Sequence, residues 1–152
     1  MKNERVCDWM TADVIAVSPD TSLVEADQIV VDNTIRRLPV VENGKLIGIS
    51  TYGDIREARP SSATSLSVWE LNYLLSQLTV REIMTPNPVT VSPEATIGEA
   101  ARLMLKNAIS GLPVVDTHHH LVGIITESDI FRMVVQQWDE MAEEPQPYAH
   151  YR

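Results

Sequence analysis

An internal repeat constrains the fold of this chain of 152 residues more than any other feature. The Val-Ser-Pro at 17–19 returns at 91–93, and the Leu-Pro-Val-Val at 38–41 returns at 112–115, both 74 positions later. The offset then becomes 75, because one residue is inserted before the Gly-Ile pair at 123–124. So many identities at one offset indicate a duplication. The fold must therefore be built from two similar halves.

The first half predicts a defined order of elements. An extended apolar piece at 14–17 leads through a Ser-Pro-Asp-Thr turn to a helix at 22–33, whose apolar residues recur at helical spacing. Strands are predicted at 37–41 and 46–50, joined by an Asn-Gly turn that is typical of a β-hairpin. A second helix begins near residue 52. Together these elements form a β-α-β-β-α unit.

The second half repeats this unit, with an extended piece at 89–91, a helix at 97–107, strands at 112–115 and 121–125, and a helix at 127–138. Between the halves, 58–65 has the Pro- and Ser-rich composition of a linker, and 67–78 predicts an amphipathic helix. That helix suits either the core or a dimer interface.

These patterns divide the chain into four parts. They are a first motif at 1–60, a linker and connecting helix at 61–79, a second motif at 80–138, and an acidic tail at 139–152 that we expect to be flexible.

Composition and charge exclude several classes of function. A net charge of −9 disfavours a broad nucleic-acid surface, because phosphate binding needs clustered Lys and Arg. The first residues lack the apolar stretch of a signal peptide, and no apolar run approaches the roughly 18 residues of a membrane span. The single cysteine, Cys7, cannot form an internal disulfide. We therefore expect a cytoplasmic protein that binds neither nucleic acid nor membrane.

The candidate binding chemistry lies in two Thr-x-x-Asp tetrads, Thr51 to Asp54 and Thr126 to Asp129, each at a predicted helix start. Such a start presents unpaired N–H groups and a positive dipole end to a phosphate. The Thr hydroxyl can donate to a phosphate oxygen, and the ionised Asp can accept from ribose hydroxyls. The same residues can also form a capping box without any ligand. Both roles stay open for each tetrad.

Two units with Leu-Pro-Val-Val before the hairpin and Gly-Ile-x-Thr-x-x-Asp after it resemble a tandem pair of CBS domains, or Bateman module. The segment 65–84 also resembles stand-alone bacterial CBS proteins of the acetoin-utilisation accessory type. The resemblance implies an α+β fold in which two β-α-β-β-α repeats pack face to face. It further implies two symmetry-related clefts for adenosine-containing ligands, and modules that dimerise into a flat disc.

In the family, each cleft combines the tetrad of one copy with the N-terminal strand of the other. The resemblance therefore implies one cleft with Val14, Ile15, Arg37, Thr126 and Asp129. It implies a second cleft with Val89, Ser110, Thr51 and Asp54, and Pro39 and Pro113 complete the expected ligand-binding residues.

Arg37 makes the two clefts unequal. Its guanidinium can clamp a phosphate bidentately, whereas the second copy has Ser110-Gly111 where the first has Arg36-Arg37. We therefore expect the Asp129 cleft to favour more phosphates than the Asp54 cleft. The alternative role of Arg37 is a basic strand edge that opposes aggregation.

Other candidate sites are weaker. Three histidines at 118–120 occupy the second hairpin turn, but consecutive side chains on a turn diverge, whereas metal ligands are usually spaced. We expect an exposed turn without a metal. Met104, Met133 and Met141 are predicted to be packing residues. No catalytic motif is present in the sequence.

The sequence therefore predicts a non-catalytic regulatory module, without cofactor or metal, that binds AMP, ADP or ATP and signals energy state to an unidentified partner protein. S-adenosylmethionine ranks behind these nucleotides, and a homodimer is expected. The alternative is a structural or interaction dimer whose clefts are filled by its own side chains. Retention of both Asp54 and Asp129 favours ligand binding.

Overall fold

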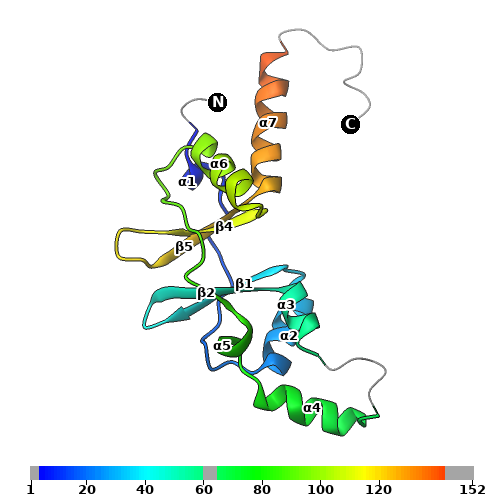
Figure 1. The fold of residues 1–152 in the computed structure, drawn as a ribbon. Coiled ribbons are helices and arrows are strands. Elements are labelled where there is room, and N and C mark those ends of the chain that lie inside the picture. The colour runs from blue at the N-terminus through cyan, green and yellow to red at the C-terminus, as the bar shows by residue number, and fades with distance from the viewer. Residues whose placement is uncertain (1–3, 60–64, 143–152) are drawn as a thin grey trace.

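The computed structural model describes residues 4–59 and 65–142, and it places two antiparallel hairpins face to face with helices on their outer sides (Figure 1). In chain order the elements are α1 (Val6–Trp9), α2 (Leu23–Asn33), β1 (Arg37–Glu42), β2 (Lys45–Thr51), α3 (Tyr52–Glu57), α4 (Val68–Gln77), α5 (Val80–Ile83), β3 (Thr85–Pro86), α6 (Ile97–Asn107), β4 (Gly111–Val115), β5 (Leu121–Thr126) and α7 (Glu127–Met141). The predicted α+β pair of repeats is confirmed.

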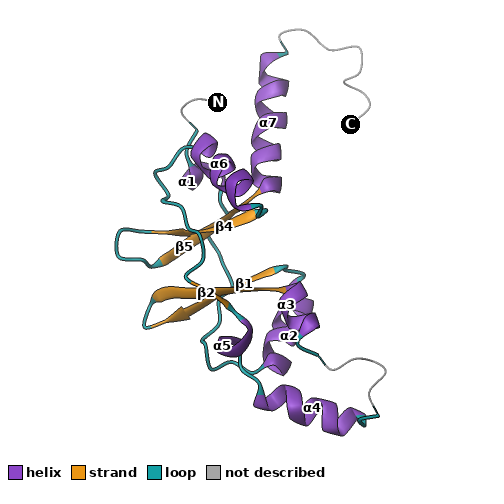
Figure 2. Cartoon of the chain, in the orientation of Figure 1, coloured by secondary structure: helices purple, strands orange, loops and turns teal. Residues whose placement is uncertain are grey.

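The two sheets share one design (Figure 2). β1 pairs with β2 through a turn at Asn43 and Gly44, both of which have positive φ, as the Asn-Gly signal predicts. β4 pairs with β5 in the same antiparallel manner, and each ladder shifts register after the equivalent residue, Val40 or Val114. The short β3 adds a third strand beside β2. The duplication therefore extends to the irregularities of the strands.

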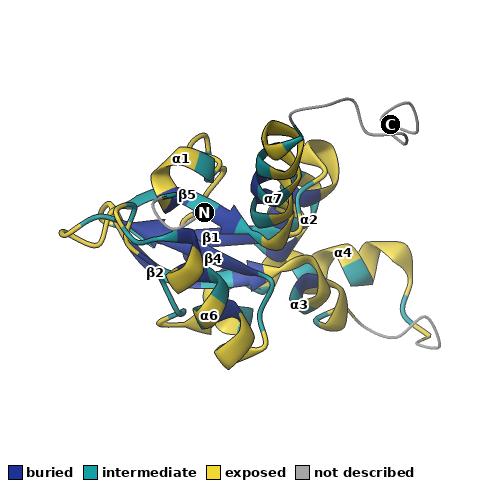
Figure 3. Cartoon of the chain, turned by 90° about the horizontal axis from the view of Figure 1, so that it is seen from above, coloured by how far each residue is buried: buried dark blue, intermediate teal, exposed yellow. Residues whose placement is uncertain are grey.

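Each half has its own apolar core between its helices and its sheet, seen as the dark-blue strands in Figure 3. In the first half, Leu23, Ala26 and Val30 of α2 pack with Leu38 and Val40 of β1. The equivalents 74 positions later are Ile97, Ala100, Met104, Leu112 and Val114. Equivalent positions thus carry equivalent burial, and that burial supplies the main stabilisation of each half.

The two halves exchange their first short helices. Val6 of α1 lies in the core of the second half, and its N–H donates to the carbonyl of Ala95 at 2.9 Å. Val80 of α5 lies in the core of the first half, and its N–H donates to the carbonyl of Thr21 at 2.8 Å. Separating the halves would therefore expose a core valine from each, so the two sequence repeats stabilise one another.

Gly48 and Gly123 lie where the exchanged segments cross the strands. A Cβ at Gly123 would lie 2.9 Å from the Thr11 carbonyl oxygen, and one at Gly48 would lie 3.1 Å from that of Thr85. Any side chain would displace the crossing backbone. Because both glycines fall inside predicted strands, the sequence predicts that a ligand or a neighbouring strand approaches the backbone closely at each of them. In the structure the neighbouring segment makes this approach.

The connecting helix α4 begins after Ser67, whose Oγ accepts from the N–H of Glu70 at 3.2 Å. No α4 residue is fully buried, and Trp69 remains 85% exposed. Its aromatic residues are therefore not core residues of the single chain. Most of the predicted linker, residues 60–64, lies outside the described residues.

The long helix α7 continues to Met141, so the predicted tail begins inside a helix, and residues 143–152 lie outside the described part. Met104 and Met133 are buried as predicted, whereas Met141 is exposed. The packing prediction for Met141 is wrong in the single chain, because α7 extends beyond the core. Within 4–59 and 65–142, no helix has both the length and the apolar character needed to cross a membrane.

Candidate functional site

A cavity of about 300 Å³ opens between the two halves. That volume lies at the lower end of the range for small-molecule sites. Three separate segments line it, through Thr11, Asp13, Val14, Ile15, Thr34, Ile35, Arg36, Arg37, Ile124 and Thr126. The structure therefore brings together four residues of the first predicted cleft: Val14, Ile15, Arg37 and Thr126. A larger, shallow hollow of about 700 Å³ follows the outer face of α7, but its lining comes from this one helix and includes no residue of the first half.

The two tetrads cap the helices that follow them. Thr51 donates its backbone N–H to Asp54 Oδ2 at 2.9 Å, and Asp54 returns its N–H to Thr51 Oγ1 at 3.1 Å. This reciprocal pair is a capping box at the start of α3. Thr51 is exposed and Asp54 is half-buried. The cap therefore leaves the second carboxylate oxygen of Asp54 available for a ligand.

The second tetrad is more enclosed. Asp129 Oδ2 accepts from the backbone N–H of Thr126 at 2.8 Å and from its hydroxyl at 3.2 Å. Asp129 Oδ1 accepts from the guanidinium of Arg132, one turn further along α7. The Asp129 side chain is only 3% exposed, and Asp129 does not line the cavity beside Thr126. Both oxygens of this carboxylate therefore have protein partners.

Arg37 begins β1 and points toward the second half. Its guanidinium donates to Ser110 Oγ, and a Cβ placed on Gly111 would lie only 2.7 Å from Arg37 Nε. Desolvation lowers the pKa of the half-buried Arg37, neighbouring Arg36 lowers it further, and Glu127 opposes both effects. Arg37 thus lines the first cleft as predicted, while its hydrogen bond reaches Ser110 of the second.

The remaining predicted residues are placed as follows. Val89 is half-buried against the core of the second half. Pro39 and Pro113 are buried inside strands, where their carbonyls accept from Val17 and Val91 at 3.0 and 3.1 Å. Neither proline lines the cavity between the halves. Their carbonyls instead hold the extended segments that lead into the predicted clefts.

Arg132 and five residues of the cavity lining were missed from the sequence: Thr11, Asp13, Thr34, Ile35 and Ile124. Arg132 stands three residues after Asp129, a spacing at which helical side chains meet, so the ion pair was visible in principle. Thr34 and Ile35 line the cavity because Thr34 ends α2 in a left-handed conformation and turns the chain toward β1. The only sequence signal that Thr34 and Ile35 belong to the site is their position directly before Arg36.

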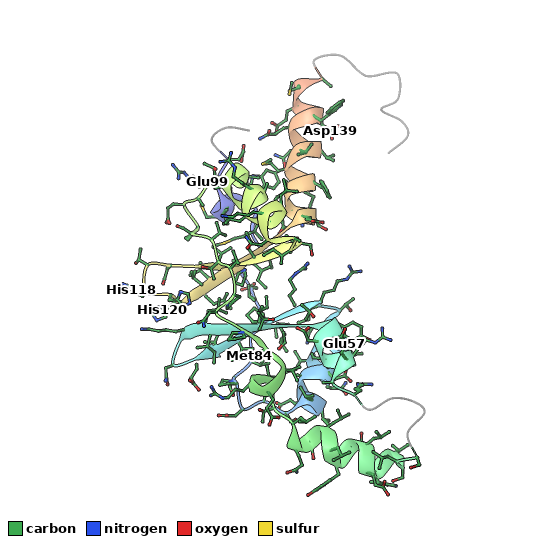
Figure 4. The ribbon with its side chains drawn as sticks, in the orientation of Figure 1. Glu57, Met84, Glu99, His118, His120 and Asp139 are labelled. Atoms are coloured by element: carbon green, nitrogen blue, oxygen red, sulfur yellow. The ribbon has the colours of Figure 1, made fainter. Side chains whose placement is uncertain are left out.

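The histidine turn lies at the tip of the β4–β5 hairpin (Figure 4). Asp116 Oδ1 accepts the backbone N–H groups of His118 and His120, each at 2.9 Å. The bond from His120 is the largest cause of the lowered pKa of Asp116. The described residues contain no group of three or more His, Cys, Asp or Glu side chains arranged to hold a metal. The Asp116 carboxylate therefore stabilises the turn through these two hydrogen bonds.

A sequence model of the CBS domain family matches residues 6–61 and 80–136. Over 128 residues the chain is 36% identical to the inosine-5'-monophosphate dehydrogenase of Korarchaeum cryptofilum, a match that covers 84% of this chain and 24% of the dehydrogenase. The chain spans between about a quarter and a half of the length of the first curated relatives it matches.

Three solved structures match over nearly their whole length. The CBS domain pair of protein MJ0100, in complex with 5'-methylthioadenosine and S-adenosyl-L-methionine, has a TM-score of 0.71 and 33% identity, covering 88% of this chain and 97% of that one. CBSX2 of Arabidopsis thaliana, in complex with AMP, has a TM-score of 0.73 and 30% identity, covering 89% and 98%. A Vibrio cholerae protein assigned to acetoin utilization (AcuB) has a TM-score of 0.73 and 29% identity, covering 93% and 98%.

Proposed function

Because the chain belongs to the CBS domain family, we propose that it is a non-catalytic regulatory module that binds an adenine nucleotide in the clefts between its two CBS motifs. The cavity lined by both halves carries this proposal. Val14 and Ile15 offer an apolar wall for the adenine ring, and Arg36 and Arg37 offer cations for phosphates. Thr126, at the start of α7, adds a hydroxyl to the same cavity.

The choice among adenosine-containing ligands rests on charge. Related structures contain AMP in one case and 5'-methylthioadenosine with S-adenosyl-L-methionine in another. S-adenosylmethionine has a cationic sulfonium centre, which two neighbouring arginines would repel, whereas a phosphate would be attracted. Arg36 and Arg37 outnumber Asp13, the acidic residue of the same lining, and therefore favour AMP, ADP or ATP over S-adenosylmethionine in this chain.

The regulatory part of the proposal follows from the architecture. Ligand binding between two halves that share exchanged helices can change how the halves sit against each other. We propose that this change is communicated to a partner protein in the cytoplasm as a signal of energy state.

Mass spectrometry of small molecules released from the purified protein tests the proposal directly. We expect an adenine nucleotide, and calorimetry should show binding of AMP, ADP or ATP. Ligand at 100 times its dissociation constant stabilises a protein by about 2.7 kcal/mol, so a thermal-shift assay should register it. If millimolar adenine nucleotide gave neither heat nor a shift, the structural-dimer alternative would replace this proposal.

We also propose a homodimer that packs through the outer helices. Val31 of α2 and Leu105 of α6 are equivalent positions, and both are exposed, by 58% and 84%. Phe131 and Trp138 of α7 add further exposed apolar area. A surface of this kind is typical of an interface between copies. Light scattering should give twice the 17.0 kDa chain mass, and a monomer at all concentrations would contradict the dimer.

A further inference from the structure

Arg37 lies beside both tetrad threonines. In the β1–β2 ladder Arg37 is the direct partner of Thr51, so it stands next to the first tetrad. Across the halves it contacts Gly111, which is the direct partner of Thr126 in the β4–β5 ladder. Arg37 also lines the cavity together with Thr126. One guanidinium therefore lies within reach of both candidate clefts.

The repeat supplies only one such cation. Gly111 is the equivalent of Arg37 in the second half, 74 positions later. Arg37 Nε and Cζ would lie 2.7 and 2.9 Å from a Cβ at that position, so Arg37 fills the space that a second side chain would need. The duplication has become asymmetric here, because two arginines cannot occupy the same place between the halves.

Arg37 also has no carboxylate fixed to it. Within 4–59 and 65–142 the arginine ion pairs are those of Arg59, Arg81 and Arg132, and Arg37 bonds instead to the neutral hydroxyl of Ser110. A hydroxyl is a weaker partner for a guanidinium than an anion is. Arg36 adds positive charge beside it, and the carboxylate of Glu127 acts on Arg37 in the opposite sense. An incoming phosphate can therefore displace Ser110 and take the guanidinium.

We propose that Arg37 is a cation shared by the two clefts, so that a phosphate-bearing nucleotide in one cleft weakens the binding of a second phosphate-bearing nucleotide in the other. This inference rests on the proposed nucleotide function. A ligand without a phosphate makes no demand on Arg37, and it binds in the two clefts independently. At equilibrium one cleft then carries the phosphate-bearing nucleotide, and the other accepts neutral ligands more readily than a second anion.

Calorimetry with AMP and with neutral 5'-methylthioadenosine tests the inference on the full chain. For the unmodified protein we expect two AMP sites whose affinities differ by about tenfold or more, the effect of one charge-assisted hydrogen bond. 5'-Methylthioadenosine should titrate two sites without this coupling. In Arg37→Gln the two AMP affinities should converge, whereas the control Arg102→Gln, on the exposed face of α6, should leave the coupling unchanged.

Two equal and independent AMP sites in the unmodified protein would overturn the shared cation, and this measurement needs no variant. The same coupling in Arg37→Gln as in the unmodified protein would overturn it as well, as would equal coupling for 5'-methylthioadenosine. If Arg37→Gln does not fold, Arg37→Lys keeps one charge without the fork of donors and should reduce the coupling. Absence of binding by both ligands would instead contradict the nucleotide function itself.

Discussion

The two Thr-x-x-Asp tetrads share a motif but not an environment. Asp54 accepts the N–H of Thr51 through one oxygen and keeps the other available, whereas Asp129 has both oxygens bound and is almost fully enclosed. The cause lies one turn beyond the motif, where the second half has Arg132 and the first half has Glu57, which is labelled in Figure 4. An arginine pairs with the tetrad carboxylate, and a glutamate cannot. Equal motifs therefore do not give equally available sites.

The comparison changes what the two aspartates should do. From the sequence, both have the same ribose-binding role, and the Asp129 cleft is the better phosphate site because it includes Arg37. In the structure the cavity does include Arg37 and Thr126, but Asp129 is withdrawn from it. The available carboxylate, that of Asp54, thus favours binding in the Asp54 cleft, whereas the cation Arg37 lines the Asp129 cleft. We infer that Asp54 contributes more to ligand binding and Asp129 more to stability.

The largest expected effect is the loss of nucleotide affinity in Asp54→Ala. A ribose hydroxyl bonded to an ionised carboxylate contributes about 1.5–3 kcal/mol, so its cleft should weaken by roughly 10- to 150-fold. Stability should fall by only about 1 kcal/mol through the lost cap. Calorimetry and denaturant unfolding on the same preparation measure the two quantities.

Glu57→Ala is the matched control for Asp54→Ala, since it removes an exposed acid from the same helix, α3, without touching the tetrad. Its nucleotide affinity should equal that of the unmodified protein. If Asp54→Ala bound as tightly as Glu57→Ala, the first tetrad would be a cap without a ligand role.

The second prediction concerns stability in Asp129→Ala. Thr126 donates its N–H to this carboxylate in a nearly water-free position, so its removal leaves a donor without a partner, at a cost of about 1–3 kcal/mol. The ion pair adds little, because Arg132 itself is mostly exposed. Urea unfolding should show a larger loss than in Asp54→Ala. Asp129→Asn, which keeps an acceptor oxygen, should recover part of it, and equal losses at both aspartates would refute the difference in burial.

Local order was predictable because its signals are local. The helix predicted at 97–107 is found as α6, with Thr96 as its cap, and the hairpin at Asn43-Gly44 has the backbone that those residues favour. The exchange of α1 and α5 has no local signal, since the bond from Val6 to Ala95 joins segments that are far apart in the chain. Gly48 and Gly123 indicated that another segment approaches the strands closely, but they did not identify that segment.

The candidate site shows the same limit. The repeat and the resemblance to CBS pairs located the tetrads and Arg37, but the direction of the Arg37 side chain depends on Gly111, which lies in the other half. The pairing of Arg132 with Asp129 was within reach of sequence reasoning, because the two residues are three apart on a helix. A residue just outside a binding motif, such as Arg132, can thus determine whether the carboxylate of that motif is available to a ligand.

The smallest expected effect is a gain in affinity from Arg132→Gln. Arg132 occupies Asp129 Oδ1, and a pair whose arginine is largely exposed contributes about 0.2–1 kcal/mol, so its removal should improve the Asp129 cleft by up to about fivefold. The measurement belongs in an Asp54→Ala background, where the first tetrad no longer contributes a ribose contact. The converse change, Glu57→Arg, should build the same pair beside Asp54 and weaken the Asp54 cleft by a similar factor. If neither substitution altered affinity, the residue three positions after each tetrad would not control its carboxylate, and the difference between the clefts would have to come from Arg37 alone.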